Sequence, residues 1–244
     1  MKAMILAAGL GTRLRPITDN RPKALVEVAG RTLLDISLSR LRDFGIREVI
    51  INVHHFADMI EEYLKANNNF GIRIDLSRED VPLDTNNSLK KTAYFFVKSS
   101  KRPNKPFILH NVDVISTIDL RKMVEFHTEN QALATLAVQN RKSSRHLLFD
   151  EHLHLCGRRS AQDHEVVRSS PELQALAFSG IHVISPRLFS MIVEEGTFSV
   201  ITAYLRLAAY GEKILGFRAD DYYWLDLGRP ENLVAAAQDL EKLP

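Results

Sequence analysis

Short apolar runs alternate, along the first 140 residues, with segments in which apolar residues recur every three or four positions. The short runs are typical of buried strands, and the wider spacing is typical of helices with one face on a core. Strands are predicted at residues 2–6, 26–29, 48–53, 73–77, 106–110 and 132–139. Helices are predicted at residues 32–44, 57–65, 89–97 and 120–130. This alternation indicates βαβ units with right-handed crossovers and a mainly parallel sheet.

After residue 140 the pattern becomes that of paired strands. Asp150-Glu151 separates two short apolar segments, which predicts an antiparallel hairpin. The elements predicted here are hairpin strands at 145–150 and 153–157, a strand at 175–184, helices at 186–195 and 200–209, strands at 214–218 and 222–226, and a terminal helix at 229–243. The predicted fold class is therefore α/β: a Rossmann-like, doubly wound, mainly parallel sheet with a small antiparallel insertion. Because no repeat or long linker interrupts the chain, residues 1–244 are predicted to form a single domain.

The first predicted strand leads directly into a loop of small residues, Ala7-Ala8-Gly9-Leu10-Gly11-Thr12. Small side chains let backbone N–H groups approach an anion, and glycine tolerates the turn geometry that points them at it. A block of cations follows: Arg13, Arg15, Arg21 and Lys23. Cations in this position suit a ligand with several phosphates. The pattern predicts a phosphate-binding loop at the carboxyl end of the first strand, where parallel sheets bind ligands.

Other interpretations of this loop are less specific or fit less well. An ordinary βα turn would also explain the two glycines. A dinucleotide-binding loop would carry a third glycine where this chain has Leu14. A Walker A loop is excluded because no Gly-Lys-Ser/Thr sequence follows at the required spacing.

Two aspartates follow predicted strands at distant points of the chain. Asp113 stands in F-I-L-H-N-V-D-V, and Asp226 stands in Y-Y-W-L-D-L-G. Mg²⁺ prefers one or two carboxylates together with phosphate oxygens, which a phosphate-binding loop would bring close. Two aspartates on one edge of the sheet would supply those carboxylates. The alternative is that each aspartate caps the turn or helix that follows it.

Composition narrows the class of ligand. The chain has 244 residues, 45% hydrophobic and 25% charged, with a formal net charge of +2 and a single cysteine, Cys156. This net charge is too small to indicate a nucleic-acid or membrane partner. The cations near the N-terminus are clustered locally, which favours a small anionic ligand. One cysteine excludes an internal disulfide framework. With no signal-peptide pattern and no apolar run of membrane-spanning length, a soluble, cytoplasmic protein is expected.

The segment A-A-G-L-G-T-R-L-R-P, followed by P-K-A-L, resembles the signature of the sugar-phosphate nucleotidylyltransferases, also called nucleotide-sugar pyrophosphorylases. The segments N-V-D and W-L-D-L-G resemble the two metal-binding segments of that family. The resemblance implies that Ala8, Gly9, Gly11, Thr12 and Arg13 bind the nucleotide triphosphate. It further implies that Arg13, Lys23 and Asp113 are catalytic and that Asp113 and Asp226 bind Mg²⁺.

The remaining site residues match the family less closely. The family's glycine-rich, base-accepting segment is replaced by Leu83-Asp84-Thr85-Asn86-Asn87-Ser88. Asn86, Asn87 and Asn111 are assigned to the nucleotide site, although Asn87 or Ser88 also suits a helix N-terminal cap. Ser179 and Gly180 are assigned to the sugar site because Phe178-Ser179-Gly180-Ile181 resembles a strand whose start borders the sugar. Asn52 and His54 either border the base or serve packing at the sheet edge.

The resemblance implies transfer of a nucleotidyl group from a nucleoside triphosphate to a sugar 1-phosphate, giving an NDP-sugar and pyrophosphate for cell-envelope carbohydrate. UTP with N-acetylmuramate 1-phosphate is the first choice, and GTP with mannose or heptose 1-phosphate is the next. About residues 1–140 would bind the nucleotide, about 141–228 the sugar, and 229–244 would form a terminal helix. The rivals are a catalytically impaired nucleotide-sugar-binding homologue, suggested by the Asn-Asn-Ser segment, and a nicotinamide dehydrogenase. Base, sugar and oligomeric state stay open.

A second group of potential ligands lies in the predicted hairpin. His152, His154 and Cys156 alternate, so a strand would place them on one face. This spacing suits zinc superficially. A solvated hairpin face opposite Leu153 and Leu155 is the preferred interpretation.

Overall fold

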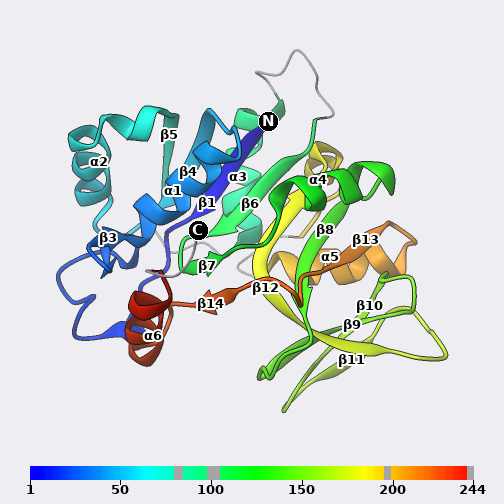
Figure 1. Ribbon diagram of the computed structural model, residues 1–244. Helices are drawn as coiled ribbons and strands as arrows, with labels where there is room; N and C mark the ends of the chain where they lie inside the picture. Colours follow the sequence, from blue (N-terminus) through cyan, green and yellow to red (C-terminus); the bar gives the residue numbers. More distant parts are fainter. Residues whose placement is uncertain (80–84, 98–104, 195–198, 241–244) are drawn as a thin grey trace. The chain divides into compact units, whose positions relative to one another are not determined.

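The computed structural model describes residues 1–79, 85–97, 105–194 and 199–240. Contacts between Cα atoms divide the chain into two compact units (Figure 1). Unit 1 consists of Met1–Leu83, Leu109–Thr117 and Tyr223–Pro244, and unit 2 consists of Asp84–Ile108 and Ile118–Tyr222. The chain therefore leaves unit 1 twice and returns to it twice. The assignment of nucleotide and sugar binding to successive parts of a single domain stays a prediction.

Unit 1 contains a parallel sheet, two short antiparallel strand pairs (β2 with β3, β7 with β14) and helices. Its strands are β1 (Lys2–Leu6), β2 (Glu27–Val28), β3 (Arg31–Thr32), β4 (Glu48–Val53), β5 (Arg73–Arg78), β7 (Val114–Ser116) and β14 (Trp224–Asp226). Its helices are η1 (Thr12–Leu14), η2 (Lys23–Leu25), α1 (Leu33–Asp43), α2 (Ala57–Ala66), η3 (Asn68–Gly71) and α6 (Pro230–Leu240). The strand order is β6-β1-β4-β5, in which β6 (Phe107–Asn111) begins in unit 2 and ends in unit 1. β1, β4 and β5 run parallel, with Leu6 opposite Asn52.

Helix α1 shows how local sequence sets the elements of unit 1. Thr32 is the N-cap, and its hydroxyl accepts a hydrogen bond from the backbone N–H of Asp35. The Asp35 carboxylate bonds to Arg31 and Ser39 and does not bond back to the Thr32 N–H, so a reciprocal capping box is only half formed. The helix buries Leu34, Leu38 and Leu41 and ends before Gly45, whose φ of 99° is left-handed.

Unit 2 is a mixed sheet with helices. Its further strands are β8 (Ala134–Gln139), β9 (Arg145–Phe149), β10 (Leu155–Ser160), β11 (His164–Val166), β12 (Gln174–Ile184) and β13 (Ile214–Arg218). Its helices are α3 (Thr85–Val97), α4 (Leu120–Glu129), η4 (Pro186–Ser190) and α5 (Val200–Ala209). β8 pairs with β13 in parallel and with β12 antiparallel, and β11-β10-β9-β12 form the predicted antiparallel portion. The rings of Phe96, Phe107 and Phe189 stack in its core.

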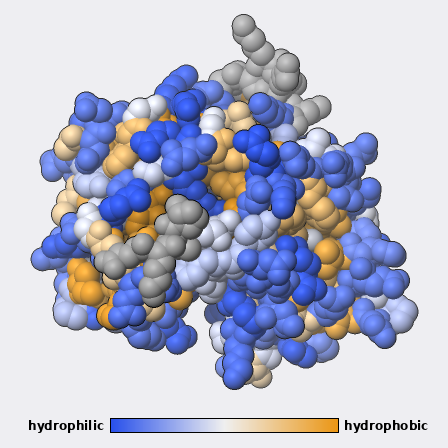
Figure 2. Space-filling model, viewed as in Figure 1, coloured by the Kyte–Doolittle hydropathy of each residue, from blue (hydrophilic) through white to orange (hydrophobic). Residues whose placement is uncertain are grey.

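The predicted fold class is confirmed, and most elements lie where the apolar pattern places them. The predicted helix at 186–195 is wrong in type and length, because only η4, a 3-10 helix, forms there. The exposed surface is largely hydrophilic on the face shown in Figure 2. In the described part of the chain, no helix has both the length and the apolar character needed to cross a membrane.

Candidate active site

The small-residue loop leaves the sheet at the carboxyl end of β1, as the sequence predicts. Ala7 and Ala8 are buried, whereas Leu10 at the tip is exposed. The Ala7 N–H is held by the side chain of Asn52 on the neighbouring strand, at 2.8 Å from Oδ1. The loop is thus anchored at its first residue and open beyond it.

The two glycines of the loop differ in what they require. Gly11 has a left-handed φ of 65°, and a Cβ there would lie 2.9 Å from Cγ2 of Thr18 and 3.2 Å from Cβ of Lys23. The Gly11 carbonyl also accepts a hydrogen bond from the Thr18 hydroxyl at 2.9 Å. A Cβ on Gly9 would have nothing within 4 Å. The fold therefore requires glycine at 11, whereas position 9 is free for close approach by a ligand.

Asn52 has a structural role that the sequence did not specify. It is buried, and its amide Nδ2 donates to Oε1 of Glu79 at 3.0 Å. Glu79 is itself 4% exposed, and its backbone carbonyl lies 2.7 Å from Nδ1 of His54. Asn52 therefore connects the first residue of the loop to a buried carboxylate beyond β5. Of the two interpretations for Asn52 and His54, these contacts favour packing at the sheet edge.

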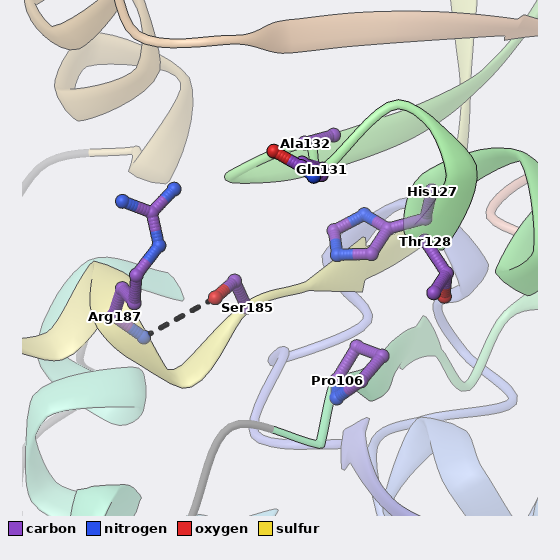
Figure 3. A pocket seen from close by; sticks show the side chains of 7 residues that line it. All are labelled: Pro106, His127, Thr128, Gln131, Ala132, Ser185 and Arg187. Atoms are coloured by element: carbon purple, nitrogen blue, oxygen red, sulfur yellow. Dashed lines mark hydrogen bonds between the residues drawn. The ribbon is translucent and has the colours of Figure 1, made fainter.

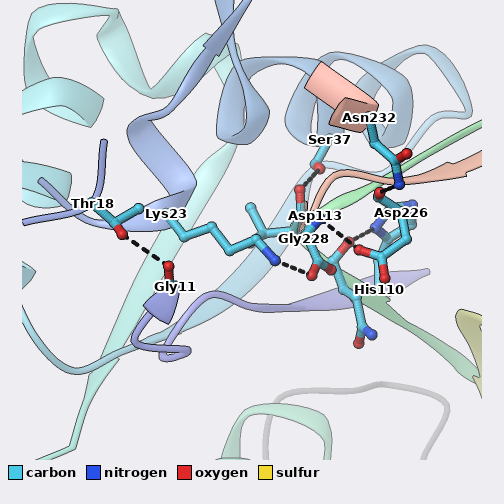
Figure 4. Close-up of polar contacts among 11 residues, drawn as sticks. Gly11, Thr18, Lys23, Ser37, His110, Asp113, Asp226, Gly228 and Asn232 are labelled. Atoms are coloured by element: carbon cyan, nitrogen blue, oxygen red, sulfur yellow. Dashed lines mark hydrogen bonds and ion pairs between the residues drawn. The ribbon is translucent and has the colours of Figure 1, made fainter. Parts of the chain in front are cut away.

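Lys23 and Asp113 form an ion pair within unit 1. Lys23 lies in η2 and is 8% exposed, and its ammonium contacts Oδ2 of Asp113 (Figure 4). Asp113 follows the end of β6 by two residues. A lysine that is nearly removed from water requires an anion close by, and this carboxylate provides it.

Asp113 and Asp226 come from distant parts of the sequence and meet on paired strands. β7 and β14 run antiparallel, with Asp226 opposite Val114. The Leu227 N–H donates to the Asp113 carbonyl at 2.8 Å. The Asn232 amide of α6 donates to the Asp226 carbonyl at 2.6 Å, which ties the strand end to that helix. Backbone pairing therefore sets these two aspartates on neighbouring positions (Figure 4).

The carboxylates leave oxygens available for a cation. Oδ1 of Asp226 accepts the Gly228 N–H at 2.7 Å, so this aspartate does cap the turn that follows it, as the alternative interpretation proposed. Within the described residues, no hydrogen bond engages Oδ2 of Asp226 or Oδ1 of Asp113. Among the residues that the structure describes, no group of three His, Cys, Asp or Glu side chains forms a metal site. Two free carboxylate oxygens fit Mg²⁺, which completes its shell with water and phosphate oxygens.

Arg13 of η1 lies against Gly228, two residues after the second aspartate. A Cβ on Gly228 would lie 2.4 Å from Nη2 of Arg13 and 2.8 Å from Oδ1 of Asp226. The guanidinium and that carboxylate thus converge over Gly228. The missing side chain of Gly228 is what makes room for Arg13, a role that the Asp-Leu-Gly sequence did not reveal by itself.

Asn111 ends β6 and is half-buried, and its carbonyl oxygen is 2.7 Å from Nδ1 of His110. His110 is fully buried, and burial together with the nearby charge of Arg40 lowers its pKa to about 3. The ring is therefore neutral at physiological pH. Its Nε2 has no hydrogen-bond partner in the described residues.

Asn86 and Asn87 lie in unit 2, at the start of α3. The helix begins at Thr85, four residues earlier than predicted, so the proposed caps Asn87 and Ser88 stand inside its first turn. Ser88 is buried, and its carbonyl accepts the Thr92 hydroxyl at 2.9 Å. Leu83 and Asp84 lie outside the described residues. The side chain of Asn86 also lies outside them.

Ser179 and Gly180 lie within β12 in unit 2. Ser179 is fully buried, with its hydroxyl 3.4 Å from Oε1 of Gln139. Gly180 has a φ of 75°, and the pairing of β12 with β8 is irregular between Phe178 and His182. An irregular strand exposes backbone groups that a regular ladder would use.

The two histidines of the hairpin form hydrogen bonds that stabilise its turn. The backbone N–H groups of His152 and His154 donate to Oδ1 of Asp150, and Nδ1 of His154 lies 3.1 Å from Oδ2. Cys156 is buried, so the expectation of one solvated face for all three side chains is wrong. The aromatic run Tyr222-Tyr223-Trp224, which its apolar character would place in the core, is partly exposed at each position.

Comparison with known proteins identifies the family that this sequence matches. The sequence model of the family described as nucleotidyl transferase matches residues 2–148. The chain is 32% identical over 243 residues to N-acetylmuramate alpha-1-phosphate uridylyltransferase of Caulobacter vibrioides, covering 96% of this chain and 94% of that protein. It is 27% identical over 236 residues to mannose-1-phosphate guanyltransferase 2 of Candida glabrata, covering 96% of this chain and 63% of that protein.

Solved structures share the fold at low sequence identity. A putative glucose-1-phosphate thymidylyltransferase from Bacillus anthracis in complex with a sucrose superposes with a TM-score of 0.81 at 19% identity, covering 100% of this chain and 96% of that chain. HddC from Yersinia pseudotuberculosis complexed with GMP-PN superposes with a TM-score of 0.75 at 22% identity, covering 98% and 99% of the two chains.

Proposed function

This chain belongs to the nucleotidyl transferase family, and we propose that it transfers a nucleotidyl group from a nucleoside triphosphate to a sugar 1-phosphate. The products are an NDP-sugar and pyrophosphate. The observation that carries the proposal is the group formed by Arg13, Lys23, Asp113 and Asp226 beside the open loop at Gly9. The name of the similar uridylyltransferase, covered over 94% of its length, supports the sugar-phosphate substrate.

The reaction joins two phosphorylated molecules without a side-chain nucleophile. An oxygen of the sugar 1-phosphate attacks the α-phosphorus of the triphosphate in line, and pyrophosphate leaves. Amide groups from Ala8 to Thr12 hold the triphosphate, and Arg13 neutralises charge on the departing pyrophosphate. Lys23 neutralises charge on the reacting phosphates and holds the Asp113 carboxylate in place.

A divalent cation, which we take to be Mg²⁺, would be held by the free oxygens of Asp113 and Asp226. When bound, the cation supplies positive charge that offsets the repulsion between the two polyanionic substrates. Asp226 has its Oδ1 fixed by the Gly228 N–H, so its other oxygen is oriented before any ligand arrives.

UTP with N-acetylmuramate 1-phosphate is the favoured substrate pair. The Caulobacter vibrioides uridylyltransferase is matched nearly end to end, whereas the chain spans only 63% of the Candida glabrata guanyltransferase. GTP with mannose or heptose 1-phosphate is the second choice. We assign the sugar to unit 2 at Ser179 and Gly180, whose irregular strand supports that role.

A pyrophosphate-release assay with each nucleoside triphosphate against each of these sugar 1-phosphates tests the proposal. We expect one pair to exceed the others clearly and chelation of divalent cations to stop release. Asp226→Asn should raise the Mg²⁺ concentration needed for half-maximal rate, because only one carboxylate remains. Pyrophosphate release from no pair, together with calorimetric binding of an NDP-sugar, would instead support the impaired binding homologue that the Asn86-Asn87 segment suggests.

A further inference from the structure

Unit 2 contains a cavity that none of the site residues above lines. Its volume is about 420 Å³, and it lies where β8 begins and β12 ends, with Ala134 opposite Ile184. The lining residues are Pro106, His127, Thr128, Gln131, Ala132, Ser185 and Arg187 (Figure 3). A volume of this size is that of a small-molecule site.

Arg187 brings a positive charge to the cavity. Its guanidinium is about half exposed, and the only acidic group near it in the described residues is Glu212, at 3.8 Å from Nη2. An ion pair of that length leaves most of the five N–H donors available to a ligand. Arginine donors in a planar fork match the oxygens of phosphate or carboxylate.

His127 faces the same cavity. The residue is only 3% exposed to solvent, and Figure 3 shows its ring directed toward the cavity. Nδ1 lies 2.9 Å from the Thr135 hydroxyl, and Nε2 has no partner in the described residues. Burial and the charge of Arg187 lower the pKa of His127 to about 4, so the ring is neutral. When Thr135 donates to Nδ1, the ring proton is on Nε2 and points into the cavity.

The other polar groups add donors from further directions. The Ser185 oxygen accepts the Arg187 N–H at 3.4 Å, which leaves the hydroxyl proton of Ser185 free to donate. The Gln131 amide has no hydrogen-bond partner in the described part of the chain. The Thr128 hydroxyl donates to the Val124 carbonyl at 2.8 Å, so toward the cavity it can only accept. Donors therefore outnumber acceptors around the cavity.

From this arrangement we propose that the cavity binds the phosphoryl group of a small phosphorylated metabolite, with Arg187 as its principal anchor. A phosphoryl group has three terminal oxygens that can meet donors from several directions, whereas a carboxylate has two oxygens in one plane. The cavity is larger than an inorganic phosphate ion, so its remaining volume accommodates a carbon skeleton. The Thr128 oxygen and the Gln131 carbonyl can accept from hydroxyl groups on that skeleton.

This site is distinct from the proposed sugar residues. Ser179 lies inside β12, whereas Ser185 follows the end of that strand six residues later, and neither Ser179 nor Gly180 lines the cavity. The inference does not depend on the proposed function, because its test measures binding in the absence of nucleotide. Failure of the transfer assay and failure of this binding test are therefore separate results.

Isothermal titration calorimetry of the whole chain with inorganic phosphate and with glucose 6-phosphate tests the inference. The titrations use an Arg13→Ala background, which weakens anion binding by the phosphate loop. We expect one saturable site for each probe, with glucose 6-phosphate bound at least threefold more tightly because it fills more of the cavity. Arg187→Ala should weaken both at least tenfold, and Arg187→Lys should recover part of the loss.

Arg145→Ala is the matched control, since it removes an exposed arginine of unit 2 outside the cavity. It should leave both affinities within twofold. Gln131→Ala provides a second cavity variant if Arg187→Ala melts at a lower temperature. Absence of saturable binding at 20 mM of either probe, or equal affinity in Arg187→Ala and its parent, would overturn the site. Equal affinities for the two probes would reduce it to an inorganic-anion site and overturn the metabolite assignment.

Discussion

The Lys23 ammonium contacts the Asp113 carboxylate, and this ion pair connects the cationic segment after the phosphate loop to the first aspartate of the sheet edge. Lys23 is 8% exposed, so its ammonium is largely removed from water and contacts this carboxylate instead. The pair therefore has two roles to separate by experiment: holding the local structure and supplying charge to the reaction.

Replacing Lys23 with methionine should lower kcat by about 100-fold or more, because charge neutralisation at the reacting phosphates is lost. Asp113→Ala should abolish turnover and lower the free energy of unfolding by about 2 kcal/mol, because it leaves a buried ammonium unpaired. Steady-state kinetics and urea unfolding of both single variants and the double variant measure the coupling. Lys2→Ala, which removes the 3.7 Å ion pair to Glu48 at the start of β1, is the control and should keep near-normal turnover. Near-normal turnover of Asp113→Ala would refute its catalytic assignment.

Gly228→Ala should displace Arg13 from the second aspartate. The new Cβ would lie 2.4 Å from Nη2 of Arg13, far inside any real contact distance, but the guanidinium can move aside. We expect kcat/KM to fall by about 100-fold, the scale of losing one charge-stabilising donor, while the melting temperature changes little. Arg13→Ala in the Gly228→Ala background should add almost no further loss. If the two losses multiplied instead, Gly228 would act independently of Arg13.

The two loop glycines should respond differently to alanine. Gly9→Ala has no atom within 4 Å of its new Cβ, so the free energy of unfolding should be unchanged within about 0.5 kcal/mol. KM for the nucleoside triphosphate should rise at least tenfold, because the methyl group stands where the phosphates approach. Gly11→Ala meets Thr18 at 2.9 Å and a φ of 65°, and should lower the free energy of unfolding by about 1–3 kcal/mol. Unchanged kinetics in Gly9→Ala would argue against a phosphate-binding loop.

Asn52→Ala should destabilise unit 1 by removing two buried hydrogen bonds. It leaves the Ala7 N–H without the Asn52 amide oxygen and leaves Glu79 without the Asn52 Nδ2 donor. The Ala7 N–H keeps its 3.2 Å hydrogen bond to the Asn52 backbone carbonyl, so the expected loss in urea unfolding is about 1–2 kcal/mol, the scale of one to two buried hydrogen bonds. Asn52→Asp should be worse than Asn52→Gln, since it places a second carboxylate beside Glu79. Equal stability of these three variants and the wild type would contradict this anchor.

Two buried histidines should make the protein less stable in mild acid. Burial, with a smaller contribution from nearby arginine charge, lowers the pKa of His110 to about 3 and that of His127 to about 4, below the ordinary value of 6.5. The unfolded chain therefore takes up protons first, so this stability is complete above pH 6.5 and is lost as pH falls toward 4. Each histidine contributes at most about 1.4 kcal/mol per pH unit in that window.

Urea unfolding at pH 7.5, 6.0 and 5.0 measures this slope. His110→Gln and His127→Gln should each flatten it, even if they lower the free energy of unfolding at pH 7.5. His152→Gln alters an exposed side chain and should follow the wild-type curve. A wild-type slope that neither core substitution reduces would assign the acid sensitivity to other groups.

The sequence predicts elements whose signal is local. β1, β4, α5 and β13 have the predicted bounds, because each is a continuous apolar run or a clear amphipathic segment between turn residues. β7 was not predicted, since its three residues pair with a strand more than a hundred positions away. The predicted helix after Pro186 stops at Ser190, although no residue there is a strong helix breaker. Tertiary packing overrides weak local preference in such segments.

The site follows the same division. The loop at Gly9 and Gly11 and both aspartates can be read from short motifs with a physical reason for each residue. The Lys23–Asp113 contact and the convergence of Arg13 on Gly228 depend on the path of the backbone between distant segments. The sequence provided only a weak indication of the role of Asn52. That indication is its position at the end of a strand, opposite Leu6 of the neighbouring strand. A polar residue at that position is a reasonable candidate for anchoring an adjacent loop.

The short antiparallel pairing between β7 and β14 also determines when, during synthesis, this part of the fold can form. During synthesis on the ribosome, β1, α1, β4 and β5 can assemble as soon as they emerge, because their pairings are between successive strands. Asp113 and Asp226 cannot come together at that stage, since the Leu227 N–H that bonds to the Asp113 carbonyl is made only after residues 118–222 of unit 2. A chain that has been made only as far as β13 therefore lacks the backbone contact that sets Asp226 beside Asp113.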